Sequence, residues 1–240
     1  AADQLRTTIA AHTSDLGGGQ MKLDSEAQFY AMDDEKPTHV VLRLLPSFLQ
    51  VQDREWRFSR ARIYADTSSV EVLNLSAQYQ DKRFSLAGRV SRYESDTLRL
   101  DLDNVDLAPL AGLLPQYKLK GIVNGYVGVA SPISPLNLLG QLQLTNFEIN
   151  GTYIGSSNLL VRWAGVENPF RLNFENRQVD GHKDIALNAK WSLQGKGFDG
   201  TLRLDRCKLQ LLDLFTKDAL SSEGYVNALL HIQGSVQQPQ

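Results

Sequence analysis

The sequence predicts a mostly β protein, in which a long curled antiparallel sheet is built from repeats and accompanied by a few short helices. Three observations lead to this fold class. Short segments of alternating apolar and polar residues recur along most of the chain, as expected for strands with one apolar face. Short polar turns separate these segments, as in an antiparallel meander. One pair of motifs recurs about a hundred residues further along the chain, which indicates a repeated unit.

The first 20 residues differ from the rest of the chain. Leu5, Ile9 and Leu16 are loosely spaced as on a helix, and the run Gly17-Gly18-Gly19 follows them. Because glycine runs end regular structure, we expect a short N-terminal helix or linker over residues 1 to 20.

Beyond residue 20, thirteen segments have the period of two that is typical of half-buried strands. They are Val40 to Leu44, Trp56 to Tyr64, Val70 to Ala77, Phe84 to Val90, Leu98 to Leu102, Ile122 to Val129, Leu139 to Leu144, Phe147 to Ile154, Leu159 to Trp163, Phe170 to Phe174, Ile185 to Leu193, Thr201 to Leu204 and Val226 to Ile232. Polar turns such as Asn150-Gly151 join them. Leu107 to Leu114 and Leu209 to Leu220 have apolar residues at three-to-four spacing, so we expect short helices there.

The two expected helices stand at matching places in the chain. Leu98-Arg99-Leu100-Asp101 precedes the first helix and Leu202-Arg203-Leu204-Asp205 precedes the second, 104 residues later. The strand that begins with Gly-Ile-Val-Asn at Gly121 follows the first helix, and Gly-Tyr-Val-Asn at Gly224 follows the second, 103 residues later. The agreement between the two separations indicates a repeated unit of this length.

The repeat suggests how the chain is organised. We expect an N-terminal helix or linker over residues 1 to 20, a first β unit over residues 21 to 118, and a second over residues 119 to 240. The second unit should continue the same sheet and be truncated within a longer array. Repeats of this kind pack mainly against their neighbours, so a piece of such an array can still fold.

The segment Gly195-Lys196-Gly197-Phe198-Asp199-Gly200 has the G-x-G-x-x-G spacing of dinucleotide-binding loops. Such a loop needs a helix after the glycines, so that the helix amides point at the phosphates. Here Thr201 to Asp205 alternates as a strand. We therefore predict a turn between two neighbouring antiparallel strands and no nucleotide cofactor.

Composition argues against several classes of function. The 25 Lys and Arg against 27 Asp and Glu give a net charge of -2 without a long run of one sign, so nucleic acid is not an expected partner. Cys207 is the single cysteine and can form no internal disulfide. No apolar run reaches the roughly 18 residues of a membrane helix. The histidines lack metal-ligand spacing and no nucleophile motif is present, so we expect no enzyme, cofactor or metal.

The order of elements over residues 46 to 240 resembles the family of AsmA-like and TamB proteins, and its Bacteroidetes branch in particular. The matching segments are Pro46-Ser47-Phe48-Leu49, Trp56, Phe84 to Ser91, Asp96-Thr97-Leu98, Asp103 to Leu107, Gly121 to Gly125, Asn150-Gly151, Trp163 and Gly224 to Asn227. The resemblance implies a long twisted sheet curled into an open trough with an apolar interior. It also implies a parent protein anchored in the inner membrane by a helix outside this sequence, in the periplasm of a diderm bacterium.

The same resemblance implies a role in outer-membrane biogenesis. The expected activity is carriage of phospholipid acyl chains between the inner and outer membranes, assistance of outer-membrane protein assembly with a barrel partner, or both. Neither needs a catalytic group.

Apart from any family, alternation predicts which residues share one face of such a sheet. Thirteen strands about 4.8 Å apart would span on the order of 60 Å, which an open sheet rarely reaches without curling or splitting. The residues expected to line a lipid-carrying groove are Val123, Val127, Val129, Leu142, Leu144, Leu159, Val161, Trp163, Phe170, Leu172, Phe174, Ile185, Leu187 and Trp191.

Two other functions also fit the sequence. In a structural or interaction module, the same apolar residues would fill a closed core that binds no lipid, and exposed strand edges would pair with a partner. In an extracellular carbohydrate-binding β-sandwich, Trp56, Trp163 and Trp191 would be candidates for stacking on sugars, although each stands in an alternating strand where burial is the simpler outcome.

Overall fold

The computed structural model describes residues 3–13, 19–30, 38–51, 54–93, 95–108, 118–130, 137–165, 167–177, 183–192, 197–209, 224–235 and 238–239. Antiparallel strands account for nearly all of these residues, and none of them lies in an α-helix. The predicted fold class, a mostly β chain with antiparallel strands, is therefore confirmed.

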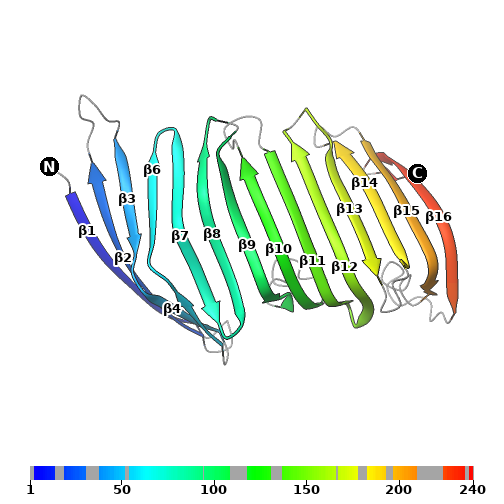
Figure 1. Ribbon diagram of the computed structural model, residues 1–240, viewed down its shortest axis with the longest axis horizontal. Helices are drawn as coiled ribbons and strands as arrows, with labels where there is room; N and C mark the ends of the chain where they lie inside the picture. Colours follow the sequence, from blue (N-terminus) through cyan, green and yellow to red (C-terminus); the bar gives the residue numbers. More distant parts are fainter. Residues whose placement is uncertain are drawn as a thin grey trace. The chain divides into compact units, whose positions relative to one another are not determined.

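The strands are drawn in Figure 1 in the colours of the sequence. They are β1 (Asp3–Thr13), β2 (Gly19–Tyr30), β3 (His39–Leu44), β4 (Ser47–Val51), β5 (Arg54–Phe58), β6 (Ala61–Asp66), β7 (Ser69–Tyr79), β8 (Lys82–Ser91), β9 (Thr97–Asp106), β10 (Leu119–Ala130), β11 (Asn137–Ile149), β12 (Thr152–Ala164), β13 (Phe170–Arg177), β14 (Ile185–Ser192), β15 (Gly197–Lys208), β16 (Tyr225–Ser235) and β17 (Gln238–Pro239). By internal contacts the chain divides into a first unit, residues 1–103 with 128–134, and a second, residues 104–127 with 135–240.

The N-terminal residues are extended rather than helical. β1 pairs with β2 over its whole length. The helix expected within residues 1 to 20 is therefore wrong for residues 3 to 13. The β-branched residues Thr7, Thr8 and Ile9 favour a strand, and pairing with a neighbouring strand outweighs the loose helical spacing.

Two expected strand boundaries are also wrong. The single strand expected from Trp56 to Tyr64 is broken at Ser59-Arg60 into β5 and β6. The strand expected from Phe147 to Ile154 crosses a turn instead. Asn150 and Gly151 have φ values of 51° and 84°, which is the conformation of a two-residue hairpin turn, and they join β11 to β12.

The glycine segment after β14 leads into a strand, as predicted. β14 ends at Ser192 and β15 begins at Gly197, and these two residues are antiparallel partners. The helices expected over Leu107 to Leu114 and Leu209 to Leu220 fall almost entirely outside the described residues.

In the first unit, two pairs of short strands are the halves of bent strands. β3 and β4 both pair with β2, while β6 and β5 both pair with β7. The first bend lies at Leu45-Pro46, where proline supplies no N–H to a ladder. The second lies at Ser59-Arg60, where the Ser59 N–H donates to the Ser76 carbonyl oxygen over 2.9 Å. Both halves of each bent strand thus remain in one sheet.

Four strand residues other than glycine have the left-handed backbone conformation. These residues are Asn74, Asn104, Asn146 and Arg206, with φ values of 60°, 53°, 51° and 51°. Register shifts accompany β-bulges in β7, β11 and β15. Because a bulge inserts one extra residue, apolar residues spaced by three keep to one face, and Leu144 and Phe147 are both buried.

Asn104 belongs to the first copy of the sequence repeat. The Asn104 N–H donates to the Asn124 side-chain oxygen over 2.8 Å. Close by, the Leu107 N–H donates to the Gly121 carbonyl oxygen over 2.9 Å. The asparagine of the Gly-Ile-Val-Asn motif therefore accepts a hydrogen bond from the backbone of β9 at its left-handed residue.

The second copy has the same arrangement. The Arg206 N–H donates to the Asn227 side-chain oxygen over 2.6 Å, and the Leu209 N–H donates to the Gly224 carbonyl oxygen over 3.0 Å. The repeat inferred from spacing therefore corresponds to a repeated piece of structure, in which the N–H of a left-handed strand residue donates to an asparagine side chain.

Gly125 is required by a close approach between β10 and β11. Its φ is +128°, and a Cβ at this position would lie 2.1 Å from the Gln141 carbonyl oxygen and 3.0 Å from the Leu142 Cα. A side chain here would force the two backbones apart.

We predict that Gly125→Ala lowers the free energy of unfolding by at least about 2 kcal/mol, because positive-φ strain of about 1–3 kcal/mol adds to the backbone clash. Urea unfolding measures the change. Gly197→Ala is the control, since nothing lies within 4 Å of its added Cβ, and it should change stability by no more than about 0.5 kcal/mol. Equal effects of the two substitutions would contradict the close approach.

The turn between β6 and β7 is closed by a carboxylate. One oxygen of Asp66 accepts hydrogen bonds from the N–H groups of Ser68 and Ser69 over 2.6 and 2.7 Å. The serine hydroxyls also donate to this carboxylate. These bonds, led by the Ser68 backbone N–H, lower the pKa of Asp66 from 3.8 to about 2.

A lowered pKa gives stability that is present above the unfolded pKa of 3.8 and is lost as the pH falls through about 2. We therefore expect the thermal midpoint of the protein to fall across this window, and Asp66→Asn to remove part of that fall. Asp103→Asn, at an exposed carboxylate, is the control. If the thermal midpoints of the wild-type chain and Asp66→Asn fell equally as the pH is lowered, Asp66 would not have this role in the turn.

Candidate functional site

A continuous row of apolar side chains crosses the sheet of the second unit. Neighbours in the row are direct cross-strand partners from β11 to β16, and direct partners lie on the same face of a sheet. The row consists of Leu142, Leu159, Phe174, Leu187, Leu202 and Leu230. The structure therefore brings together four of the residues predicted to line a groove, and adds Leu202 and Leu230.

A second row runs beside the first on the same face. Its members are Gly140, Val161, Leu172, Ala189, Gly200 and Ile232. Val127 of β10 extends this row, because a Cβ added at Gly140 would lie 3.6 Å from Val127 Cγ2 and 3.6 Å from Val161 Cβ. Small residues at three positions, Gly140, Ala189 and Gly200, make this row shallower than its neighbour.

Aromatic side chains mark one end of the face. Phe170, Trp191 and Phe198 are successive cross-strand partners, and the Phe170 and Trp191 rings meet edge to face with centroids 5.6 Å apart. The Phe198 ring covers Gly200, since a Cβ there would lie 2.8 Å from two of its ring carbons. Trp163, the partner of Leu138, has a buried Nε1 without a hydrogen-bond partner in the described part of the chain.

The opposite end of the face is closed. Val123, Leu144 and Leu204 are buried there, and Ile185 is the direct partner of Leu204. Val129 belongs to the segment of β10 that is grouped with the first unit, so it is not placed on this face. Among the predicted lining residues, Val123, Leu144 and Ile185 therefore lie at the closed end of the face, and those in the two rows form its open part.

Buried polar groups accompany this closed end. Ser157 is the partner of both Leu144 and Asn176. The Asn176 amide donates to the Ile154 carbonyl oxygen over 2.9 Å and accepts from the Ile185 N–H over 2.7 Å. One buried side chain therefore bridges two strands where the ladder alone leaves backbone groups unpaired.

Cys207 lies at the same end and is fully buried. Burial, with a smaller contribution from the charge of Asp184, raises the pKa of the Cys207 thiol to about 11. The group stays a protonated thiol at neutral pH, so it packs as a small apolar side chain rather than acting as a nucleophile.

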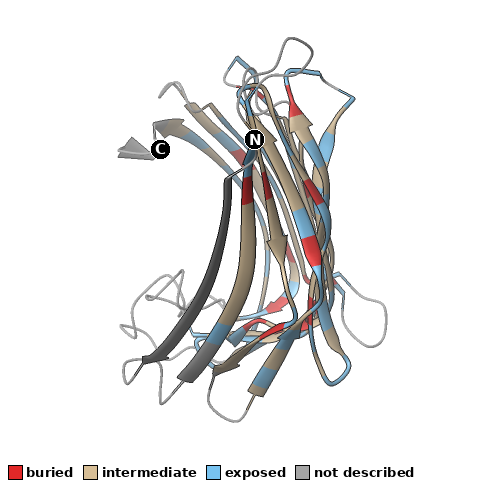
Figure 2. Cartoon of the chain, turned by 90° about the vertical axis from the view of Figure 1, so that its left-hand side faces the viewer, coloured by how far each residue is buried: buried red, intermediate tan, exposed pale blue. Residues whose placement is uncertain are grey.

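The open part of the face is not covered by the described residues. None of the six residues in the leucine-rich row is buried, and Trp191 and Leu230 retain 41% and 44% of their accessible surface. Every described strand of the second unit belongs to its one sheet. Intermediate burial also predominates among the strands seen in Figure 2.

The reverse face is polar over the same strands. The neighbouring row of direct partners is Gln141, Leu160, Asn173, Asn188, Thr201 and His231. The Asn173 amide donates to the Asn188 side-chain oxygen. Five of these six residues are polar, so the two faces of the sheet differ in polarity, as in a sheet with one solvated and one apolar face.

The first unit has an apolar face of the same kind. One row across β2, β3, β6 and β7 consists of Ala27, Leu42, Ile63 and Val72. Trp56 packs among aromatic rings on this unit, with centroids 6.0 Å from Tyr79 and 5.6 Å from Phe84. Trp56 is therefore a packing residue rather than a free stacking platform.

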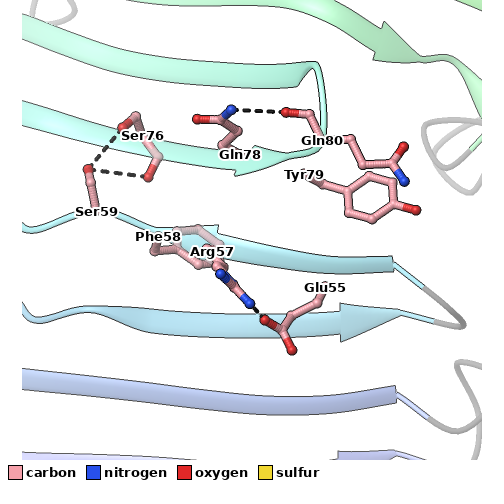
Figure 3. A pocket seen from close by; sticks show the side chains of 8 residues that line it. All are labelled: Glu55, Arg57, Phe58, Ser59, Ser76, Gln78, Tyr79 and Gln80. Atoms are coloured by element: carbon pink, nitrogen blue, oxygen red, sulfur yellow. Dashed lines mark hydrogen bonds and ion pairs between the residues drawn. The ribbon is translucent and has the colours of Figure 1, made fainter.

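A polar depression of about 650 Å³ lies in the first unit where β5 and β7 diverge. Figure 3 shows its lining, in which the Ser59 hydroxyl bonds to Ser76 and the Arg57 guanidinium pairs with Glu55 over 2.7 Å. Alternation of apolar and polar residues does not reveal this depression, because it arises where the strand is interrupted at Ser59.

Within the described residues, no three His, Cys, Asp or Glu side chains are grouped so that they could hold a metal ion. The same part of the chain contains no helix with the length and apolar character needed to cross a membrane.

No family model, curated protein or solved structure matches the chain. As a class, the fold and its candidate site define a repeat-built antiparallel β protein with one open apolar face.

Proposed function

We propose that this chain is a non-enzymatic segment of a lipid conduit, in which the apolar face of the second unit contacts the acyl chains of phospholipids. The observation that carries the proposal is the row of six apolar partners across β11 to β16, none of which is buried. If other side chains of the protein covered this face in a closed core, the residues of the row would be buried.

The dimensions of the row suit an acyl chain. Six strands give five spacings of about 4.8 Å, or roughly 24 Å across the sheet. One leaflet of a bilayer has a hydrocarbon depth of roughly 15 Å, half of the usual core. A chain lying across the strands would therefore keep apolar contact along its length, and each buried CH₂ group is worth about 0.8 kcal/mol relative to water.

The resemblance to AsmA-like and TamB proteins supplies the cellular setting of the proposal. In that setting the parent protein is anchored in the inner membrane and spans the periplasm of a diderm bacterium. It carries phospholipid toward the outer membrane, assists the assembly of outer-membrane proteins with a barrel partner, or does both. The sheet needs no cofactor or catalytic group for either task.

We predict that a photo-crosslinking amino acid at Leu187 forms adducts with phospholipid in cells fed labelled phosphate. Leu187 lies in the middle of the apolar row between Phe174 and Leu202. The readout is radioactivity on the purified protein after irradiation.

Asn188 is the matched control, because it is the next residue of β14 and belongs to the polar row with Asn173 and Thr201. Adducts should be absent there. If the protein folds normally and forms no lipid adduct at either position, the lipid-conduit proposal is wrong. That result would favour a sheet whose apolar face is covered by other protein.

A second function, an interaction module that pairs through a strand edge, is favoured by the exposure of β16. This strand pairs with β15 on one side, and on the other side only Gly234 and Ser235 pair with a described strand. Tyr225 and Leu229 of β16 are 70% and 72% exposed. A long edge with exposed apolar residues is a template for strand addition.

If β16 pairs with a second copy of the chain, Leu229→Lys should weaken self-association by at least about tenfold, since lysine on an edge strand opposes pairing. Sedimentation velocity over a concentration series measures this. Leu139→Lys is the control, because Leu139 is also exposed but lies in β11, away from this edge. A wild-type chain that stays monomeric at its solubility limit would rule out this self-pairing.

A further inference from the structure

A second depression in the first unit, of about 550 Å³, is lined by three arginines. Arg43, Arg60 and Arg62 share it with the apolar side chains of Leu45 and Leu73. No aspartate or glutamate is among its lining residues. The depression is therefore a cationic site with an apolar border.

The strand register places two of these cations directly opposite each other. Arg43 of β3 is the antiparallel partner of Arg62 of β6. Like charges at such positions destabilise a sheet. Arg60 also lines the depression. It stands in the interruption between β5 and β6, immediately before Ala61, the first residue of β6.

The protein supplies little compensation for these charges. In the described part of the chain, the side chains of Arg43 and Arg60 make no hydrogen bond or ion pair. Arg62 donates to the neutral Tyr64 hydroxyl over 3.0 Å, and its guanidinium carbon lies 6.0 Å from the centroid of the same ring. Neither contact supplies a negative charge.

Acidic groups near the site do not neutralise it. Glu26 is the partner of Arg43 across β2 and β3, yet the two side chains form no ion pair. Asp24, two residues away on the same strand, is paired with Lys22 over 3.1 Å. Glu71 is the partner of Tyr64 in the next row, and on its other side it faces Arg89. The cluster keeps an excess of positive charge.

We propose that this depression binds a phosphate group. Guanidinium groups present fixed pairs of N–H donors that match phosphate oxygens, and an anion between Arg43 and Arg62 would relieve their repulsion. The volume exceeds that of a bare phosphate, and Leu73 is 37% exposed at its border. The site can therefore hold either free phosphate or the phosphate of a lipid headgroup.

This inference does not depend on the proposed lipid face. Arg43 and Arg62 alternate along their strands with Leu42 and Ile63 of the apolar row, so they point away from that row. Loss of phosphate binding and loss of acyl crosslinking would consequently be separate results.

The test compares the full chain in phosphate and in chloride at matched ionic strength. We expect inorganic phosphate to raise the thermal midpoint of the wild-type chain in a concentration-dependent way, as binding to the folded state requires. Calorimetric titrations with inorganic phosphate and with dihexanoyl phosphatidic acid then distinguish the two sources. Tighter binding of the lipid identifies a headgroup site, and equal binding identifies a site for phosphate alone.

Arg43→Gln is the informative variant, because it breaks no interaction within the described part of the chain. Phosphate affinity should fall at least about tenfold, as expected for the loss of one charge-assisted hydrogen bond. The midpoint in chloride should be unchanged or higher, since repulsion is removed. Arg99→Gln is the matched control, because Arg99 is an exposed arginine already paired with Asp101 over 2.7 Å.

Two results would overturn the site. One is a wild-type midpoint that is the same in phosphate and chloride, with no heat of binding from either probe. The other is a phosphate response in Arg43→Gln that equals those of the wild-type chain and Arg99→Gln, because binding would then be a general effect of surface charge.

Discussion

The structure depends on keeping one face of each sheet apolar while the strands bend. A strand alternates with a period of two, so an extra residue in a regular strand would turn the following side chains to the other face. The bulges at Asn74, Asn146 and Arg206 accommodate such a residue in the left-handed conformation, so that the side chains after the bulge keep to the original face. Asn227 secures one of them by accepting a hydrogen bond from the bulged backbone. Bending and a single apolar face are thus compatible only because of these local breaks.

This constraint links the repeat to the candidate function. Each copy provides a strand with a left-handed residue and an asparagine that accepts a hydrogen bond from the N–H of that residue. The buried residues gather near the bulge, at Leu204 and Cys207 for example, while the rows further along the strands stay partly exposed. A sheet closed at one end and open along the rest can expose apolar surface without losing its own core. That division supports an acyl-binding face more directly than any single residue does.

The polar side of the first unit shows how the same breaks create a different chemistry. The interruption between β5 and β6 brings Arg60 to a depression that already contains the opposed pair Arg43 and Arg62. It also opens the polar depression beside Ser59. Irregularities in the strands therefore have two effects in this protein. The bulges keep apolar residues on one face, and the interruption between β5 and β6 leaves space for polar groups on the other face.

The sequence by itself determined the strand periodicity, the Asn150-Gly151 turn, the repeat and most of the apolar face, because these follow from short-range patterns of side chains and backbone preference. It did not determine that residues 3 to 13 form a strand, since the partner strand β2 decided that outcome. Nor did it reveal the pairing of Arg43 with Arg62 or the continuation of the row to Leu230. Register and bulge position are set by contacts between strands distant in sequence, so only the tertiary structure decided which residues meet.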